Sequence, residues 1–217
     1  MSDARVRYTT LEIGDMDIHI RMLRDVLQFD DPEGVAGKLG ISSAAWPIFG
    51  VIWPSGEVLA HLMMDYQVKG KRVLEVGCGI ALASLVLNHR AADITATDHH
   101  PSVGDFLDYN VGLNKDKIIP FVRTGWEEPF HDKLGTFDLI IGSDLLYEDA
   151  HVNLLAEFIN QHVRPCCEIV IVDPGRGFHA KFTRKMKTLG YSQSQRKHES
   201  IDYLKKHFKG WVLTYSK

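Results

Sequence analysis

The sequence predicts an α/β protein whose doubly wound, mostly parallel sheet is covered by helices on both faces. Three observations lead to this class. From residue 71 onward, short apolar runs typical of strands alternate with helical apolar spacing. The first of these runs, residues 73–76, ends in Gly77 and Gly79 directly before a helix. The chain of 217 residues is 45% hydrophobic, which is enough for one good-sized core.

The part before residue 71 has a different character. Residues 6–22 alternate around a central turn, which predicts two strands. Residues 24–52 are irregular, and this N-terminal extension is too short to hold a core of its own. Ser55 is the predicted N-cap of a helix that opens in the run Trp53-Pro54-Ser55-Gly56. We therefore expect a single domain over residues 1–217, in which residues 1–52 cover a core of residues 53–217.

Seven strands and four further helices are expected in this core. The strands fall at residues 73–76, 94–97, 118–122, 138–142, 168–172, 191–197 and 210–216. The helices fall at residues 81–89, 102–113, 150–163 and 178–189. Ser102 and Asp105 form a variant of the capping box at the second of these helices, and Gly190 ends the last one.

Composition argues against several classes of protein. The net charge is −3 and no basic block stands out, so we expect no nucleic-acid partner. No apolar run is long enough to span a membrane and residues 1–5 do not resemble a signal peptide, so we expect a cytoplasmic protein without a membrane partner. Cys78, Cys166 and Cys167 lack metal-ligand spacing, which indicates reduced thiols and no metal site.

The glycine turn after the first strand carries the first functional signal. A tight turn into a helix N-terminus offers backbone N–H groups and a helix dipole to a polar ligand, and glycines let the backbone approach it closely. A dinucleotide site needs a third glycine where this chain has Leu82, which argues against NAD and FAD. Glu75, two residues before Gly77, suits a ligand with a cationic end. An ordinary strand-to-helix turn is the alternative.

Three further positions suit a nucleotide-like ligand. Asp98 ends the next strand about 20 residues beyond Glu75, the spacing at which a carboxylate accepts hydrogen bonds from ribose hydroxyls. Trp126 follows the third strand, where a flat ring can stack on or edge an adenine, although core packing explains it equally well. Trp53 precedes a helix that packs on the cleft. Its ring can close the far end of the ligand, or it can serve as a hydrophobic staple.

The run Ser143-Asp144-Leu145-Leu146-Tyr147 follows the fourth strand. The first and fourth strands flank the switch point of a doubly wound sheet, so Asp144 and Tyr147 are expected beside the glycine turn. An aromatic ring and a carboxylate suit a substrate amine, through cation–π contact and through a hydrogen bond or charge. We interpret both residues as catalytic, with Asp144 orienting the amine and accepting its proton. A purely structural acid is the alternative.

The run from Glu75 to Gly79 resembles motif I of the class I S-adenosylmethionine-dependent methyltransferases, with Ala81 where their third glycine usually stands. The resemblance implies a Rossmann-like sheet of seven strands whose last strand is antiparallel. It also implies S-adenosyl-L-methionine as the cofactor, with the motif I glycines facing its amino-acid part.

A narrower resemblance covers residues 45–175. The Trp-Pro-Ser-Gly run, the tryptophan after the third strand and Asp-Leu-Leu-Tyr after the fourth resemble the seven-strand protein-lysine methyltransferases. That family includes enzymes acting on chaperones, elongation factors and the electron-transfer flavoprotein β subunit. The resemblance implies an Asp-x-x-Tyr motif at the methyl acceptor, formed here by Asp144 and Tyr147. It implies cofactor contacts at Trp53, Gly77, Cys78, Gly79, Asp98, Trp126 and Ser143.

The predicted function is therefore an S-adenosylmethionine-dependent N-methyltransferase acting on a lysine of a protein partner. Two alternatives stay open: methylation of a small amine such as nicotinamide, and a cofactor-binding module without activity. The branch of the family is also open. Asp173-Pro174-Gly175-Arg176 resembles the flavoprotein-directed branch, whereas Ser143 to Tyr147 is closer to the other branches.

Overall fold

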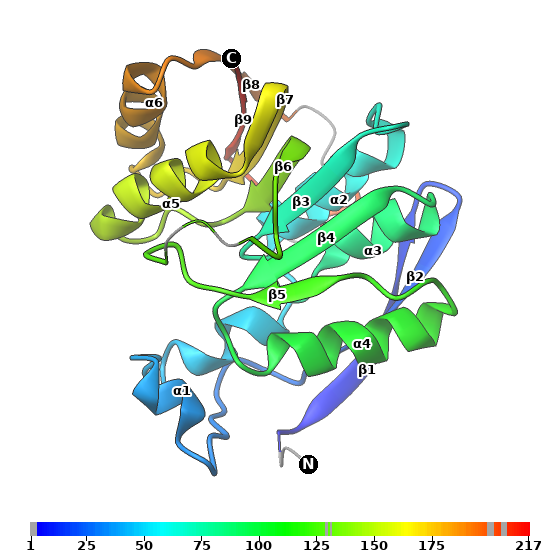
Figure 1. Cartoon of the computed structure of the whole chain (residues 1–217). Coiled ribbons are helices and arrows are strands. Elements are labelled where there is room, and N and C mark those ends of the chain that lie inside the picture. Colours follow the sequence, from blue (N-terminus) through cyan, green and yellow to red (C-terminus); the bar gives the residue numbers. More distant parts are fainter. Residues whose placement is uncertain (1–3, 129, 131, 199–201, 205–207) are drawn as a thin grey trace.

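A seven-stranded sheet forms the centre of the computed structural model, which describes residues 4–128, 130, 132–198, 202–204 and 208–217 (Figure 1). The strand order is β5-β4-β3-β6-β7-β9-β8. Five strands pair in parallel: β3 (Arg72–Val76), β4 (Asp93–Asp98), β5 (Phe121–Arg123), β6 (Phe137–Ser143) and β7 (Val163–Asp173). The last strand, β9 (Trp211–Ser216), runs antiparallel between β7 and β8 (Ser192–Lys197). The predicted doubly wound sheet with an antiparallel last strand is confirmed.

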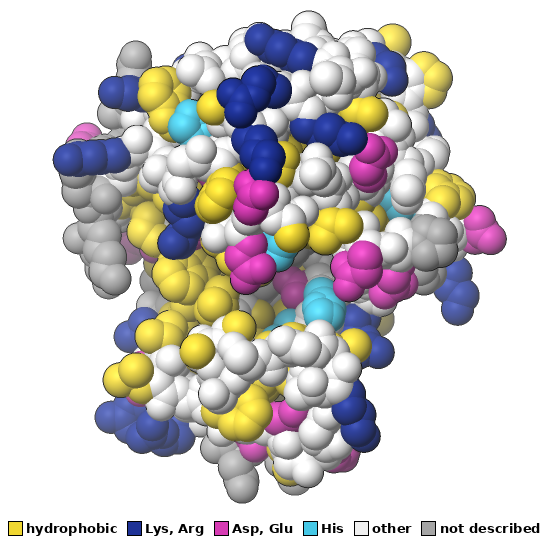
Figure 2. Space-filling model, turned by 90° about the vertical axis from the view of Figure 1, so that its left-hand side faces the viewer, with side chains coloured by type: hydrophobic (Ala, Val, Ile, Leu, Met, Phe, Trp, Pro, Cys, Tyr) yellow, Lys and Arg dark blue, Asp and Glu magenta, His cyan; other side chains and the backbone are white. Residues whose placement is uncertain are grey.

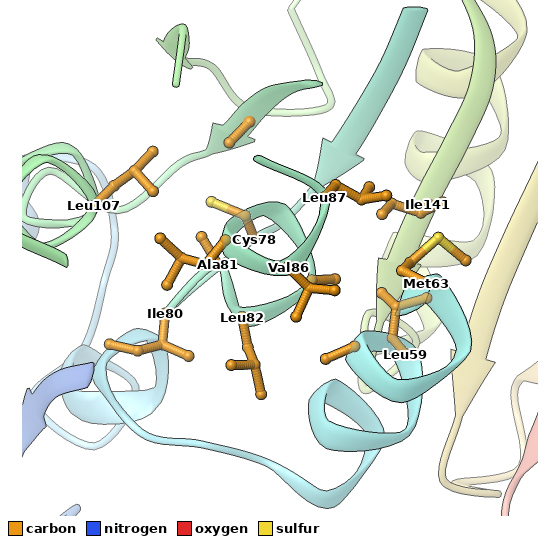
Figure 3. Packing of buried hydrophobic residues seen from close by; sticks show 14 of the residues in the cluster. Leu59, Met63, Cys78, Ile80, Ala81, Leu82, Val86, Leu87, Leu107 and Ile141 are labelled. Carbon is orange, nitrogen blue, oxygen red and sulfur yellow. The ribbon is translucent and has the colours of Figure 1, made fainter. Parts of the chain in front are cut away.

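Helices cover both faces of this sheet because each helix buries one apolar side. One face packs against α2 (Pro54–Asp65), α3 (Leu82–His89) and α4 (Val103–Asn114), and the other packs against α5 (Asp149–Gln161) and α6 (His179–Thr188). On the first face, α2 and α3 pack against each other, and Leu59 and Met63 of α2 belong to the same buried cluster as Leu82 and Val86 of α3 (Figure 3). This contact holds the start of α2 next to the glycine turn that precedes α3.

The N-terminal extension packs into the same core as the sheet. Strands β1 (Val6–Ile13) and β2 (Met16–Leu23) form an antiparallel hairpin that packs on α4. Asn110 of α4 fixes this contact, since its side chain accepts a hydrogen bond from Arg21 N at 2.7 Å and donates one to Arg21 O at 3.1 Å. A short helix, α1 (Val35–Lys38), and the 3-10 helix η1 (Trp46–Gly50) follow.

Four local predictions differ from the structure. Strand β7, predicted at residues 168–172, already begins at Val163, and the helix predicted at residues 150–163 ends at Gln161. The N-cap of α2 is Trp53 and not Ser55, because proline is favoured as the first helical residue and Pro54 takes that place. Ser102 is the N-cap of α4, but its backbone is itself helical and its side chain makes no cap hydrogen bond. The third core strand, predicted at residues 118–122, begins only at Phe121. Gly190 lies just beyond the end of α6, as predicted.

Candidate active site

The parallel strands open at their carboxyl ends onto a cavity of about 800 Å³, which η1 and the start of α2 wall from the other side. Figure 2 shows this hollow crossing the face of the molecule, with hydrophobic, acidic and histidine side chains around it. Its size is that of a small-molecule site. All ten site residues selected from the sequence line it: Trp53, Glu75, Gly77, Cys78, Gly79, Asp98, Trp126, Ser143, Asp144 and Tyr147.

The glycine turn forms the floor of the cavity. Gly77 and Gly79 have φ angles of +57° and +52°, in the left-handed region that glycine adopts without strain. A Cβ on Gly77 would lie 2.6 Å from Leu145 Cδ2, and one on Gly79 would lie 3.0 Å from Phe49 O. Ala81 is also left-handed, with φ +58°, so the backbone there has a conformation that glycine adopts without strain. The turn therefore presents bare backbone to the cavity.

Glu75 brings a buried carboxylate to the wall beside this turn. Its side chain accepts hydrogen bonds from Ser84 N at 2.9 Å and from the Ser84 hydroxyl, which ties it to the first turns of α3. Burial raises the pKa of Glu75 to about 7, and the Ser84 hydrogen bonds oppose this rise while Asp98 adds to it. Ser84 was not selected from the sequence.

Asp98 joins the glycine turn to the next loop. Its carboxylate accepts hydrogen bonds from Gly79 N at 2.9 Å and from His100 N at 2.8 Å. Burial raises the pKa of Asp98, which these backbone hydrogen bonds partly offset. Burial likewise raises the pKa of the Cys78 thiol. The backbone N–H of Cys78 donates to Thr97 O at 2.9 Å. The acid is thus held rigidly where β4 meets the cavity.

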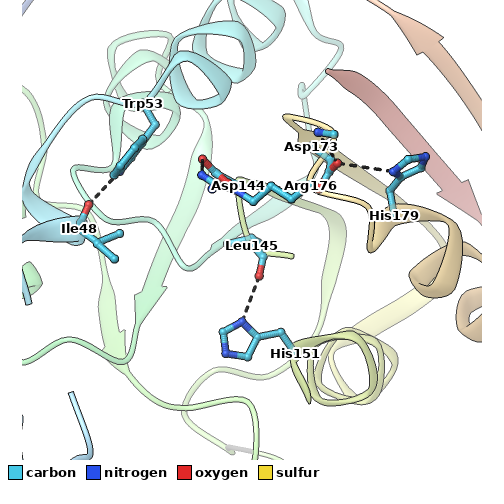
Figure 4. A network of polar contacts seen from close by, with 9 residues as sticks. Ile48, Trp53, Asp144, Leu145, His151, Asp173, Arg176 and His179 are labelled. Atoms are coloured by element: carbon cyan, nitrogen blue, oxygen red, sulfur yellow. Dashed lines mark hydrogen bonds and ion pairs between the residues drawn. The ribbon is translucent and has the colours of Figure 1, made fainter. Parts of the chain in front are cut away.

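Aromatic rings line the opposite side. The indole N–H of Trp53 donates to Ile48 O at 2.9 Å, which fixes the ring against η1 (Figure 4). His151 of α5 lies between two other rings, edge-on to Trp126 at 5.2 Å and to Tyr147 at 4.5 Å between centroids. Desolvation raises the pKa of Tyr147 to about 12, so its phenol stays protonated. The sequence offered no signal for His151 beyond its position four residues after Tyr147.

Asp144 is paired with an arginine that sequence reasoning did not place in the site. Arg176 donates from Nε to one carboxylate oxygen at 2.8 Å and from a terminal nitrogen to the other at 3.0 Å (Figure 4). The backbone of Asp144 has φ +55°, and its N–H donates to Val172 O at 2.9 Å. Side chain and main chain of Asp144 are therefore both fastened to β7 and the turn that follows it.

No group of three or more His, Cys, Asp or Glu side chains among the described residues is placed to hold a metal ion. Of the helices in the described part of the chain, none combines the length and apolar character needed to cross a bilayer.

The strand order and the cavity at the switch point define the fold of the Rossmann-like methyltransferases. Solved structures with this fold include a methyltransferase from Pyrococcus furiosus, with 18% identity, a TM-score of 0.60, and coverage of 73% of this chain and 81% of that one. Another is the 16S rRNA N2 G1207 methyltransferase of T. thermophilus, with 13% identity, a TM-score of 0.63, and coverage of 99% and 51%.

Residues 42–188 match the family described as lysine methyltransferase, and the chain belongs to this family. The electron transfer flavoprotein beta subunit lysine methyltransferase of Xenopus laevis is 29% identical over 134 residues, or 60% of this chain and 53% of the relative. Protein N-lysine methyltransferase METTL21A of Danio rerio is 33% identical over 107 residues, or 46% and 49%. The chain spans about half the length of the curated relatives it matches. S-adenosylmethionine is the cofactor that the family and fold support.

Proposed function

We propose that this chain transfers a methyl group from S-adenosylmethionine to the ε-amine of a lysine in a protein substrate. One observation carries the proposal: a single cavity over the glycine turn is lined by the cofactor candidates from β3 and β4 and by the acceptor candidates after β6. A donor and an acceptor bound there would be held close together, and such positioning supplies much of the rate of a group transfer.

The cofactor side is assigned residue by residue. Glu75 and the turn of Gly77, Cys78 and Gly79 would hold the amino-acid end, because the buried Glu75 carboxylate complements its ammonium and the N-terminus of α3, which follows the turn, complements its carboxylate. Asp98 would accept from the ribose hydroxyls, and Trp126 would contact the adenine. Trp53 and Ser143, which lie on the wall between α2 and β6, would close the methionine end.

The acceptor side consists of Asp144 and Tyr147. When bound, S-adenosylmethionine supplies a sulfonium methyl group, which a neutral amine takes with its lone pair while the carbon–sulfur bonding pair returns to sulfur. Lysine has a pKa near 10.4, so its ammonium must first release a proton to water. Tyr147 would place its ring face against the nitrogen as this gains positive charge on methylation, and Asp144 would accept an N–H of the amine and orient its lone pair. Their main contributions are positioning and removal of water.

A protein fits the acceptor role better than a small amine does. Tyr147 and Ile48 line the cavity and are 45% and 39% exposed, so the cavity reaches the surface and a lysine side chain can enter from outside. The matched relatives are named as lysine methyltransferases for the electron transfer flavoprotein beta subunit and for calmodulin, which supports a protein partner. The Asp-x-x-Tyr reading of Asp144 and Tyr147 belongs to this proposal.

The wider assignments are proposals as well. We assign residues 1–217 to one methyltransferase domain, in which the extension of residues 1–52 covers a catalytic core of residues 53–217. We place the activity in the cytoplasm, because the adjacent Cys166 and Cys167 are free thiols. No nucleic-acid partner is expected, given the net charge of −3.

The test is to incubate the purified protein with methyl-labelled S-adenosylmethionine and a whole-cell lysate and then to locate the label. Label in lysine of a protein band supports the proposal. Label confined to small molecules transfers the assignment to a small amine, and no label indicates a module without activity. At a cofactor concentration below saturation Asp98→Ala should strongly lower the signal, and Asp108→Ala, which removes an exposed acid of α4, should leave it unchanged.

A further inference from the structure

The turn after β7 is built to present Arg176 to the acceptor side of the cavity. Asp173, the last residue of β7, is buried, and its carboxylate accepts a hydrogen bond from Gly175 N at 2.8 Å. This bond closes the Asp173-Pro174-Gly175 turn and sets the direction in which the next residue leaves it. Arg176 then reaches back over the carboxyl end of the sheet to Asp144 (Figure 4).

The contact between the two side chains has the geometry of a strong pair. Both carboxylate oxygens of Asp144 accept from the guanidinium, at 2.8 and 3.0 Å, and both residues line the cavity. The Asp144 side chain is 11% exposed and that of Arg176 is 45% exposed, so the carboxylate is largely shielded from water while the guanidinium is partly exposed. A forked pair of this kind fixes the plane of the carboxylate and cancels its charge.

We propose that Arg176 is a positioning residue that fixes Asp144 and balances its charge, so that the lysine of the substrate reaches the cofactor as a neutral amine. The inference rests on the proposed function. A carboxylate without a partner would attract the ammonium form of lysine and hold its proton, and an ammonium has no lone pair for the methyl group. Paired with Arg176, Asp144 keeps free lone pairs that accept an N–H of the amine, but it no longer favours the charged form.

Other charged and titratable groups face this pair from the elements around it. They come from β4, from the loop after β6, from α5, from β7 and from α6, and they comprise Asp98, Tyr147, Glu148, His151, Asp173 and His179. This set contains no lysine and no second arginine, so Arg176 is the main local opponent of ammonium binding. These groups are the same in the wild-type enzyme and in the Arg176 variants below, so their electrostatic effect cancels when the rates are compared.

Arg176→Gln and Arg176→Lys separate charge from position. The glutamine variant removes the cation, which leaves the Asp144 carboxylate to favour the ammonium form of lysine. The pH at which the methylation rate rises should therefore be higher by about one to two pH units. At pH 7.5 we expect a loss of about tenfold or more, with recovery toward the wild-type rate above pH 9. The lysine variant keeps the charge but lacks the fork, so it should lose activity by a similar factor at every pH.

The assay measures initial rates of label transfer from S-adenosylmethionine to the protein band found with wild-type enzyme, between pH 6.5 and 9.5. Binding of S-adenosylhomocysteine is measured alongside and should change less than threefold in both variants. Arg184→Gln removes an exposed arginine of α6 away from the cavity and serves as the matched control with an unchanged profile. The double variant Asp144→Asn/Arg176→Gln should be no slower than Asp144→Asn alone, because the two side chains act as one unit.

Failure of the proposed function and failure of the role given to Arg176 would overturn the inference in different, distinguishable ways. If the wild-type enzyme labels no lysine, the proposed function fails and this inference fails with it. If lysine is labelled but Arg176→Gln keeps the wild-type pH profile, the inference alone is wrong. The same holds if the rate loss of Arg176→Gln is independent of pH and the double variant shows the product of the two single rate losses.

Discussion

Replacing Glu75 by glutamine is expected to make the free protein more stable at neutral pH. The carboxylate is 3% exposed and burial raises its pKa from the usual 4.5 to about 7. Glutamine has the same shape and keeps one carbonyl oxygen to accept from both Ser84 groups. The substitution therefore removes a desolvated charge and retains the hydrogen bonds that tie β3 to α3.

The magnitude follows from the difference in pKa between the folded and unfolded states. Below about pH 4.5 the carboxyl of Glu75 is protonated in both states, and its charge has no effect. Between pH 4.5 and about 7 only the unfolded chain loses the proton, so the wild-type free energy of unfolding falls as pH rises. At 1.36 kcal/mol per pH unit, the total loss is about 3 kcal/mol, reached above pH 7. Glu75→Gln avoids this loss.

Urea unfolding followed by tryptophan fluorescence at pH 5, 6, 7 and 8 measures the effect. For an m-value of about 2 kcal/mol/M, the midpoint of Glu75→Gln should exceed that of wild type by about 1.5 M at pH 8 and by much less at pH 5. Glu33→Gln, at an exposed position, is the control. Equal stabilities at pH 8, or a difference that is the same at pH 5 and pH 8, would refute the reasoning. Affinity for S-adenosylmethionine should move the opposite way, falling about 10- to 150-fold if Glu75 holds its ammonium.

Three further predictions concern the cavity. Calorimetry should show binding of S-adenosylmethionine in the micromolar range, about −8 kcal/mol, and much weaker binding of NAD, since Leu82 stands where a dinucleotide site needs glycine. Asp98→Ala should weaken the cofactor by about 10- to 150-fold, and an unchanged affinity would exclude Asp98 as the ribose acid. In label-transfer assays Asp144→Asn should lower turnover on the order of 10²-fold while cofactor affinity is retained. Tyr147→Phe should lose little turnover. Wild-type turnover in Asp144→Asn would contradict the role of Asp144 at the acceptor.

Much of the fold followed from the chain because its local signals agree with one another. The buried run before Gly77, the helical spacing after Ala81 and the regular alternation that follows predict a parallel sheet with a switch point at β3, and β3 lies between β4 and β6. The errors fall at element ends, where short-range competition decides. Pro54 displaces Ser55 from the cap of α2, and Pro120 lies just before the late start of β5.

The site was predictable as far as it depends on strand ends. Asp98 ends the parallel strand β4 and Asp144 directly follows β6, and the carboxyl ends of such strands meet at one edge of the sheet. Ser84 and His151 lie on helices, where the sequence shows which face is apolar but not which polar residue turns toward a cavity. Ser84 reads as one more small residue of a buried helix, although it is the partner of Glu75.

The pairing of Arg176 with Asp144, unlike the positions of Ser84 and His151, can be inferred from the register of β6 and β7. Strands β6 and β7 are parallel neighbours with Ser143 opposite Val172, so the residues just beyond each strand must lie close together. A turn of only two residues after Asp173 then places Arg176 within reach of Asp144, and opposite charges at that distance pair. The sheet order expected for the fold therefore implies the pair before any side chain is placed. It also means that the acid proposed for the acceptor side comes with a built-in counter-charge, so its role has to be tested together with that of Arg176.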